Sequence, residues 1–392
     1  MTYKQIRKRI GTRRKWMHAR CHVRQLRYIS SMLRRTFLGT LPAAAALAVP
    51  QSQPLPVKLG FDTYSLRAFK WKAGELLDFA AQQKLDTVQI SSLDDFASRE
   101  PAYLQKIKDQ AARANISIDG GTGCICPSSK SFKAGPPASE RVLEGLRISK
   151  AVGATSMRCY LGSSDDRTGP LPIEAHMENT IKVFKSVRTE ALDLGVKIAL
   201  ENHNGDMQAR EVRTIIEESG KDFVASCLDT GNPMWVAEDP MVSLEVLAPY
   251  VVTTHIRDSA IFEHPRGAAA QWVVLGQGSV DFVKFVAQFR KLCPKSTMQL
   301  EVITGRPPRI VPYLEPDFWK AFPKTPAAEF YRFVALAKSG HPYMGPMVIE
   351  DVTGLKVPAT MTEALKEQQR IDLIQSLDYA KKSLNAGVNW RV

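Results

Sequence analysis

Four residues in the second half of the chain have the side chains of a divalent-metal site: Glu201, Asp229, His255 and Glu301. Each stands in or directly after a short apolar run, and successive members are 28, 26 and 46 positions apart. Three carboxylates and one imidazole at one place suit a single divalent ion, for which we expect Mn²⁺, with Mg²⁺, Co²⁺ and Zn²⁺ as alternatives. Taken singly, each residue has a structural explanation, an ion pair for the acids or a hydrogen bond for the histidine. Their joint pattern indicates the metal site.

The elements that would bring these residues together are short β-rich runs, which alternate with longer helical patterns from residue 57 onward. Such alternation is typical of βα units with a parallel sheet. Eight strands in this series favour a closed (β/α)8 barrel, in which the active site lies at the C-terminal strand ends. The four candidate ligands stand at the ends of strands five to eight. The predicted strands span residues 57–61, 87–91, 116–119, 156–160, 197–201, 223–229, 251–256 and 297–302.

Helices are predicted between these strands, at residues 74–83, 100–114, 137–152, 173–194, 208–219, 242–248 and 279–291. An insertion around residues 261–274 lengthens the connection between strands seven and eight. The barrel core is assigned to residues 49–303 on this basis.

Residues 304–392 are predicted to be a C-terminal helical extension of the barrel. After a Pro-rich part and a helix at about 327–339, the last helix places four apolar residues on one face, as an amphipathic helix does: Leu373, Leu377, Ala380 and Leu384. We expect it to be the eighth barrel helix. Residues 304–358 would then lid the site, contact another subunit of a homo-oligomer, or only pack on the outside.

Several motifs around the candidate ligands resemble those of the xylose isomerase-like barrels, and more narrowly those of the sugar phosphate isomerase/epimerase group. They are Leu200-Glu201-Asn202-His203, Leu228-Asp229-Thr230-Gly231-Asn232, His255-Ile256-Arg257-Asp258 and Leu275-Gly276-Gln277-Gly278-Ser279-Val280-Asp281. The resemblance covers roughly residues 57–303. It implies a small carbohydrate substrate and one metal ion bound by Glu201, Asp229, His255 and Glu301. It also implies that the two glutamates act as catalytic acid and base.

The motifs depart from those of the ketose epimerases in this group at two positions. Asn232 stands where those enzymes have a histidine, and Ile261 stands where they have an arginine. Both positions contact substrate in those relatives, so the sugar, and epimerisation itself, stay open. We expect His203, Asn232 and Arg257 to contact the substrate. The alternative role for His203 is to orient a metal ligand.

The resulting prediction is a metal-dependent sugar isomerase or epimerase that works through an enediolate, with Glu201 and Glu301 as acid and base. One alternative is a lyase or dehydratase for keto-sugars, inositols or oxidised glycosides, because these reactions use the same enolate chemistry. Another is a non-catalytic sugar-binding protein, against which the two retained glutamates argue. Endonucleases of the same superfamily need additional histidines at the ends of strands two, three and six, and the sequence has none there.

Two smaller features allow more than one interpretation. The turn Gly276-Gln277-Gly278-Ser279 precedes a helix and could cradle a phosphate, but a tight turn with an N-cap explains it equally well, so no phosphate group is predicted. The neighbouring Asp258 is expected to form an ion pair within its loop. Cys124 and Cys126 could be a metal or redox pair, although such pairs usually have two intervening residues.

The formal net charge of +13 belongs to an N-terminal leader. Twelve Lys or Arg residues lie between Met1 and Arg35, and the first acidic residue is Asp62. Subtracting these twelve from 53 basic residues leaves 41, against 40 acidic residues. The rest of the chain is therefore close to neutral, which argues against nucleic acid as a partner.

The leader has the features of a twin-arginine signal peptide, assigned to residues 1–48. Arg34 and Arg35 precede a short apolar run, and Ala46-Leu47-Ala48 supplies a cleavage signature. The apolar run is shorter than the roughly 20 residues that span a bilayer, so no stable membrane anchor is expected after cleavage. We expect export to the periplasm or the cell exterior.

Overall fold

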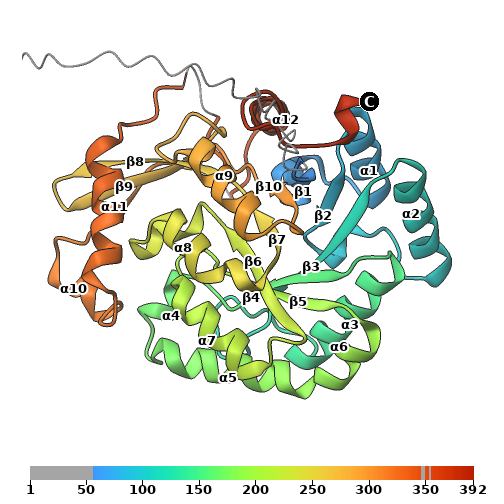
Figure 1. Ribbon diagram of the computed structural model, residues 1–392, viewed down its shortest axis with the longest axis horizontal. Helices are drawn as coiled ribbons and strands as arrows, with labels where there is room; N and C mark the ends of the chain where they lie inside the picture. Colours follow the sequence, from blue (N-terminus) through green and yellow to red (C-terminus); the bar gives the residue numbers. More distant parts are fainter. Residues whose placement is uncertain (1–55, 346–348, 353–354) are drawn as a thin grey trace, which may run out of the picture. The chain divides into compact units, whose positions relative to one another are not determined.

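The eight predicted strands form one parallel sheet in the computed structural model, which describes residues 56–345, 349–352 and 355–392 (Figure 1). The leader lies outside the described residues. Neighbours in the sheet follow the chain from β1 to β7, and β10 lies beside β1. Ile256 forms a parallel bridge with Leu300, which joins β7 to β10 and closes the barrel as predicted. The strands are β1 (Leu59–Asp62), β2 (Thr87–Ile90), β3 (Ser117–Cys124), β4 (Ser156–Tyr160), β5 (Lys197–Glu201), β6 (Val224–Asp229), β7 (Val251–His255) and β10 (Met298–Leu300).

A buried polar network lies among these strands and reaches the candidate site. Asp119 Oδ2 accepts hydrogen bonds from Thr253 Oγ1 at 2.9 Å and from Gln299 Nε2 at 2.9 Å. Gln89 Nε2 donates to Thr253 Oγ1 at 3.0 Å, and the other amide atom of Gln89 contacts His255. Because buried polar groups are costly unless paired, this network fixes the strands on which the site is built.

Helices follow the strands and lie on the outside of the barrel (Figure 1). The helix predicted over residues 173–194 is divided in two, because Val187 leaves the helical conformation (φ −108°, ψ 4°) and buries its side chain. The other predicted helices are present. Those between the strands are α1 (Ala73–Gln82), α2 (Pro101–Arg113), α3 (Ala138–Ala151), α4 (Ser164–Arg167), α5 (Ile173–Ser186), α6 (Arg188–Leu194), α7 (Ala209–Ser219), α8 (Pro240–Leu247) and α9 (Phe282–Leu292).

The stretch predicted only as an insertion folds into a second, antiparallel sheet. β8 (Asp258–His264) and β9 (Gly267–Val273) form a hairpin, and β11 (Arg309–Val311) pairs with β9. The short α10 (Pro316–Lys320) follows, and α11 (Ala327–Ser339) packs against both strands of the hairpin. An apolar cluster separate from the barrel core holds these elements together, with Ile261, Ala270, Val311, Phe333 and Ala337 among its buried members.

The last helix, α12 (Ala359–Lys382), packs against β10 and against the short helix η1 (Thr63–Phe69). Its buried face is the predicted one and includes Leu373, Leu377 and Ala380, with Leu384 buried just beyond the helix. This position between the last and the first strand is that of the eighth helix of a barrel. Within the described part of the chain, no helix is both apolar and long enough to span a membrane.

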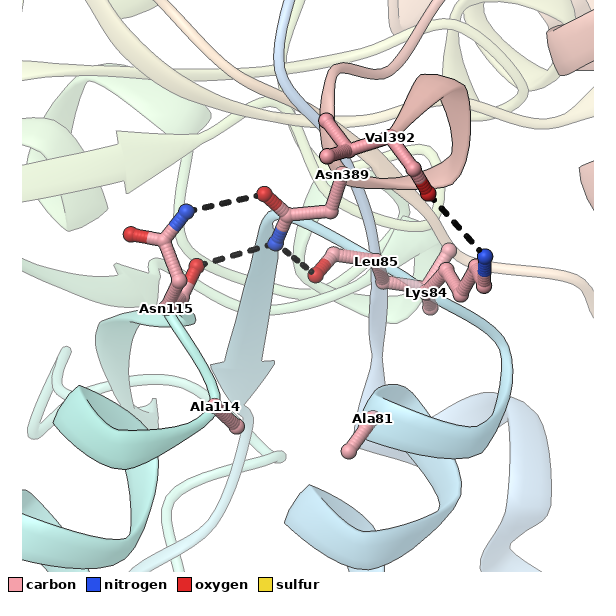
Figure 2. Close-up of a pocket in the computed structure, with 7 residues that line it drawn as sticks. All are labelled: Ala81, Lys84, Leu85, Ala114, Asn115, Asn389 and Val392. Carbon is pink, nitrogen blue, oxygen red and sulfur yellow. Dashed lines mark hydrogen bonds between the residues drawn. The ribbon is translucent and has the colours of Figure 1, made fainter.

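A cavity of about 420 Å³ lies at the N-terminal end of β2 and β3, where the end of the chain is held (Figure 2). Asn389 Nδ2 donates to the carbonyl oxygens of Leu85 at 2.8 Å and Asn115 at 3.0 Å, and Lys84 Nζ donates to Val392 O at 3.2 Å. None of the described residues that line it has a carboxylate or imidazole side chain. The predicted metal ligands are therefore not in this cavity but at the opposite end of the barrel.

Candidate metal centre

The structure brings the four predicted ligands together at the C-terminal strand ends. Glu201, Asp229 and His255 are the last residues of β5, β6 and β7, and Glu301 directly follows β10. One ligand atom from each lies within 4.8 Å of the others. Glu201, Asp229 and His255 are fully buried, whereas Glu301 keeps 4% of its surface exposed. Four residues that are distant in sequence thus form one compact donor set.

The donor atoms of this set are spaced as ligands of one ion. His255 Nδ1 lies 3.1 Å from Glu201 Oε1, 3.3 Å from Glu301 Oε2 and 3.9 Å from Asp229 Oδ2. Metal–ligand bonds of about 2.0–2.2 Å separate neighbouring ligand atoms by roughly 3–4 Å. The buried Glu301 Oε2 makes no well-aligned hydrogen bond in the described structure, although Arg257 Nη2 lies 2.6 Å and His255 Nδ1 3.3 Å away. Both observations fit a divalent cation bound by these residues.

Asp62 and Gln89, which were not predicted from the sequence, orient the His255 ring through its Nε2 atom. Its Nε2 lies 3.2 Å from Asp62 Oδ2 and also contacts Gln89 Oε1. Since Gln89 Nε2 already donates to Thr253, its oxygen faces the imidazole and accepts the Nε2 proton. This leaves Nδ1, which is aimed at the three carboxylates, as the nitrogen that would lose its proton to bind a metal ion. Such support of the second ring nitrogen is usual for metal-binding histidines.

Asp229 is held by the loop that follows it. Its Oδ1 accepts hydrogen bonds from the backbone N–H groups of Gly231 at 2.7 Å and Asn232 at 2.6 Å. Asn202, next to Glu201, hydrogen-bonds both backbone groups of Asp229 at 2.9 Å. The motif residues around the candidate ligands therefore serve to fix the Asp229 carboxylate, which leaves Oδ2 directed to the centre.

Two buried arginines neutralise the carboxylates. Arg158 Nε donates to Glu201 Oε2 at 2.5 Å, from the adjacent strand β4. Arg257 Nε donates to Asp229 Oδ2 at 2.9 Å, and its Nη2 lies 2.6 Å from Glu301 Oε2. Arg257, which the sequence analysis placed on the substrate, therefore contacts two candidate metal ligands as well as the cavity described below. Arg158 was missed, although a charged residue inside an apolar strand was a usable indication.

The arginines also control the charge of the acids. Burial raises the pKa of Glu201, but Arg158 and His255 outweigh it and hold this pKa well below its usual range. Burial is likewise outweighed at Glu301, where Arg257 and His255 lower the pKa to about 2. At Asp229 burial prevails over Arg257 and raises the pKa to about 7. Both glutamates are therefore ionised at neutral pH, as metal ligands must be.

A cavity of about 690 Å³ opens at this end of the barrel, and Glu301 is the only candidate ligand among its described lining residues. Glu201 lies behind Arg158 and beside Asn232 Nδ2, which donates to Glu201 Oε1 at 3.2 Å. The three predicted substrate residues, His203, Asn232 and Arg257, all line the cavity. Trp235, Trp272 and Arg309 line it too and were not predicted.

His203 is fixed by its neighbours rather than by a metal ligand. Its Nδ1 lies 2.6 Å from Gly162 O, and its ring stacks on Tyr160 with 3.8 Å between centroids. Burial lowers the pKa of His203 to about 4, so the imidazole is neutral at pH 7. Since Nδ1 donates to the carbonyl, Nε2 is an acceptor. His203 can therefore receive a hydrogen bond from a hydroxyl group in the cavity.

The glycine turn before α9 binds an acid of the chain itself. Asp258 Oδ2 accepts hydrogen bonds from the backbone N–H groups of Gly276 and Gly278, both at 2.9 Å. A Cβ atom at Gly278 would lie 2.2 Å from Asp258 Oδ1, so only glycine allows this approach. Asp258 thus pairs with backbone amides, not with the ion-pair partner that we expected. The place where a phosphate could have been bound is taken by this carboxylate.

The cysteines in the described part of the chain are free and buried. Cys124 Sγ lies 2.7 Å from Leu161 O, and Cys126 Sγ lies 3.4 Å from His176 O. The two thiols therefore have separate backbone partners and form no disulfide with each other.

Comparison with known proteins agrees with this architecture. The sequence profile of the xylose isomerase-like TIM barrel family matches residues 77–313, which is more than half of the chain. The chain belongs to this family. A curated relative, 3-oxo-isoapionate decarboxylase of Pectobacterium atrosepticum, is 22% identical over 236 residues, or 57% of this chain and 78% of the relative.

One solved structure is similar enough to show the same fold. A D-psicose 3-epimerase determined in the presence of D-fructose aligns with a TM-score of 0.52 at 14% identity, covering 84% of this chain and all of that one. A xylose isomerase domain protein from Planctomyces limnophilus aligns with a TM-score of 0.47 at 17% identity, covering 63% and 90% of the two chains. At 14% identity the likeness to the epimerase concerns the fold alone.

Proposed function

We propose that this chain is a metal-dependent isomerase that acts on a keto- or aldo-sugar through an enediolate. The observation that carries the proposal is the position of Glu301, which belongs to the candidate donor set and is also exposed to the cavity. A divalent ion bound there would supply the positive charge that stabilises the oxyanion of an enediolate. A substrate in the cavity would therefore meet this charge and an ionised carboxylate at the same place.

Glu301, His203 and Arg257 have different roles in this proposal. Glu301 removes the proton next to the substrate carbonyl and returns it to the former carbonyl carbon, while the proton of the adjacent hydroxyl group moves to the former carbonyl oxygen. His203 accepts a hydrogen bond from a substrate hydroxyl through Nε2 and thereby orients the sugar. Arg257 contacts both Asp229 and Glu301, so its positive charge reduces the repulsion between the two carboxylates. General acid/base catalysis by one such group is worth roughly 10²–10⁴-fold in rate.

The two glutamates are not equivalent, and this bears on epimerisation. Inversion at carbon needs proton carriers on opposite faces of the substrate, for which Glu201 was the second candidate. Glu201 Oε2 is engaged by Arg158, and the Glu201 side chain is fully buried. Proton transfer by Glu301 on one face, as in aldose–ketose isomerisation, therefore fits the geometry better than two-base epimerisation.

A lyase is the second candidate, and the same asymmetry favours it. Dehydration or decarboxylation of a keto acid forms an enolate that needs only one proton carrier, which Glu301 supplies. The relative from Pectobacterium is named as a decarboxylase. The two candidates share the metal centre and differ in whether the carbon skeleton and its substituents stay intact.

The deciding experiment follows the products in D₂O. Protein loaded with Mn²⁺, Mg²⁺, Co²⁺ or Zn²⁺ is incubated with free, oxidised and glycosidic sugars, and the products are identified by NMR and mass spectrometry. Isomerisation should place solvent deuterium at carbon without change in composition, whereas a lyase should release water, carbon dioxide or an aglycone. Glu301→Gln should lose turnover and keep the fold, while the exposed Glu218→Gln on α7 should behave as wild type. Binding without conversion of any sugar would favour the non-catalytic alternative and contradict the proposal.

A further inference from the structure

One wall of the cavity is a continuous row of stacked aromatic and cationic side chains that runs away from the metal centre. The guanidinium of Arg257 lies over Trp272, 4.4 Å from the ring centroid. Trp272 meets Trp235 edge to face, with centroids 5.5 Å apart, and Arg309 lies 4.2 Å over the Trp235 ring. The row begins at Arg257, which contacts the candidate ligands, and ends at Arg309 on β11.

This wall is built by elements outside the eight-stranded barrel. Trp272 lies on β9, Arg309 on β11 and Trp235 on the short helix η3 (Asn232–Val236) after β6. The pairing of β11 with β9 places Arg309 opposite Ala270, two residues before Trp272. The second sheet and the cluster beneath it therefore hold the row in place and extend the cavity beyond the metal centre.

Buried polar atoms without partners are concentrated along the same cavity. Trp235 Nε1, Trp272 Nε1, Asn204 Oδ1 and Asn232 Oδ1 have no hydrogen bond in the described structure, and all four residues are lining residues. Leaving such groups unpaired costs free energy, so their gathering in one place indicates a ligand that supplies the missing bonds. Two donors and two acceptors match the hydroxyl groups of a sugar, whose apolar C–H faces also suit indole walls.

The acidic residues of the inner site already have cationic partners. Glu201 pairs with Arg158, and Asp229 and Glu301 both pair with Arg257. Arg309 and Lys133 stand outside this group and line the cavity, where the only acidic residue in the described lining is Glu301. Neither has an ion pair to a carboxylate in the described part of the chain. Their positive charge is thus available to a ligand.

We propose that the substrate carries an anionic group, a carboxylate or a phosphate, at the end distant from the metal centre, and that Arg309 binds it at the outer end of the tryptophan row. Trp272 and Trp235 contact the sugar between the two ends. The inference rests on the proposed function for the reacting end, and it specifies the substrate class as a sugar acid or sugar phosphate in place of a neutral sugar. Asp258 occupies the glycine turn, so the anion has no competing site there.

Binding measurements with three probes of common shape test this inference. D-glucose, D-glucuronate and D-glucose 6-phosphate are titrated into Mn²⁺-loaded protein by calorimetry, with quenching of tryptophan fluorescence as a second readout. One or both anionic probes should bind about tenfold or more tightly than glucose, the usual size of a charge-assisted hydrogen bond. The comparison of the two anions tells carboxylate from phosphate.

Variants of the cavity wall test whether Arg309 causes the preference for anionic probes. Arg309→Gln should abolish the anion preference and leave glucose affinity within about twofold, and Arg309→Lys should restore part of it. Trp235→Phe, which removes the indole N–H together with part of the ring, should weaken neutral and anionic probes alike. The control Arg147→Gln makes the same change in net charge on α3, where Arg147 pairs with Glu190 outside the cavity. It should bind all three probes as wild type does.

The outcomes separate this inference from the proposed function. Equal affinity for glucose and both anions, or an anion preference that survives Arg309→Gln, overturns the anionic-substrate inference and leaves the metal centre untouched. If the wild type bound neither a metal ion nor any of the three probes, the proposed function would be contradicted instead. A uniform drop in anion affinity in Arg147→Gln would show that only the net charge of the chain acts.

Discussion

Arg158 on β4 and Glu201 on β5 form an ion pair in which the arginine side chain is 7% exposed and the glutamate side chain is fully buried. The pair leaves Glu201 Oε1 directed at His255, 3.1 Å away, while Oε2 is committed to the guanidinium. In the Glu201 carboxylate, Oε2 therefore belongs to the ion pair, and Oε1 is directed at the candidate metal centre. We propose that Glu201 serves as a metal ligand and not as a proton carrier, because it does not line the cavity.

Removal of this arginine should reveal how much the pair stabilises the fold. Arg158→Met leaves an unpaired buried carboxylate, which is expected to lower the free energy of unfolding of metal-free protein by about 3–5 kcal/mol. Urea denaturation in the presence of a chelator measures it. Arg147→Met, which breaks the exposed pair with Glu190, should leave stability nearly unchanged. Equal stability of Arg158→Met and wild type would mean that Glu201 is protonated or solvated in the native state.

The metal content should depend on the individual donors. Purified wild type is expected to hold about one divalent ion, and Asp229→Asn or His255→Ala should lose it, as measured by elemental analysis after dialysis. A ligand present at about 100 times its dissociation constant adds about 2.7 kcal/mol to stability, so added Mn²⁺ should raise the melting temperature of the wild type but not of the two site variants. Glu218→Gln is the matched control. Full metal occupancy in both site variants would place the ion elsewhere.

A buried acid outside the centre should give the stability a pH dependence. Glu238 accepts a hydrogen bond from Ser243 Oγ at 2.6 Å, and burial raises its pKa to about 7, partly offset by Ser243 and the Ala209 N–H. The native state therefore binds this proton more tightly than the unfolded chain, whose glutamates titrate near 4.3. Stability should fall by about 3 kcal/mol as the pH rises from roughly 4.5 to 7.

Glu238→Gln should remove that slope, because glutamine resembles the protonated acid at every pH. The variant is expected to be more stable than the wild type above pH 7 and similar to it near pH 4.5. Denaturation curves at five or six pH values, with Glu218→Gln as the exposed control, measure the difference. An unchanged slope in Glu238→Gln would show that other groups cause it.

We also propose that the leader exports the folded protein by the twin-arginine route. Arg34→Lys combined with Arg35→Lys should keep the protein in the cytoplasm, because that route recognises the arginine pair. Cell fractionation with markers for each compartment measures the distribution, and Arg13→Lys with Arg14→Lys upstream is the control. Unchanged export of the first double variant would mean that residues 1–48 have another role.

The sequence was sufficient to predict that the four candidate ligands lie together, because they follow the periodic pattern of strands in a barrel. Each ligand ends a buried parallel strand, and such strands are continuous apolar runs that are easy to recognise. Glu201, Asp229, His255 and Glu301 could therefore be aligned before any contact was known. The rule that places them also applies to Asp62 at the end of β1, which lies behind His255 and was overlooked.

The outer wall of the cavity could not be predicted in the same way. Trp272 lies on a strand with three consecutive alanines, which have little preference for β structure. Arg309 is placed by pairing between β11 and β9, across about 40 residues of sequence. Neither the strand pairing nor the edge-to-face contact of Trp272 with Trp235 leaves a periodic pattern in the sequence, so the cavity wall could be found only from the tertiary structure.

Closure of the barrel by distant parts of the chain has a kinetic consequence. Ser65 Oγ donates to Leu300 O at 3.1 Å although the two positions are 235 apart in sequence. Glu201, Asp229 and His255 come from consecutive βα units whose contacts form over short loops, while Glu301 joins them only when β10 meets β1. An ion already bound by the first three ligands would gain Glu301 as its fourth ligand when β10 pairs with β1. Metal binding would therefore favour this step. The supply of metal during folding would then govern how quickly the barrel closes, and refolding should be faster with Mn²⁺ than with a chelator.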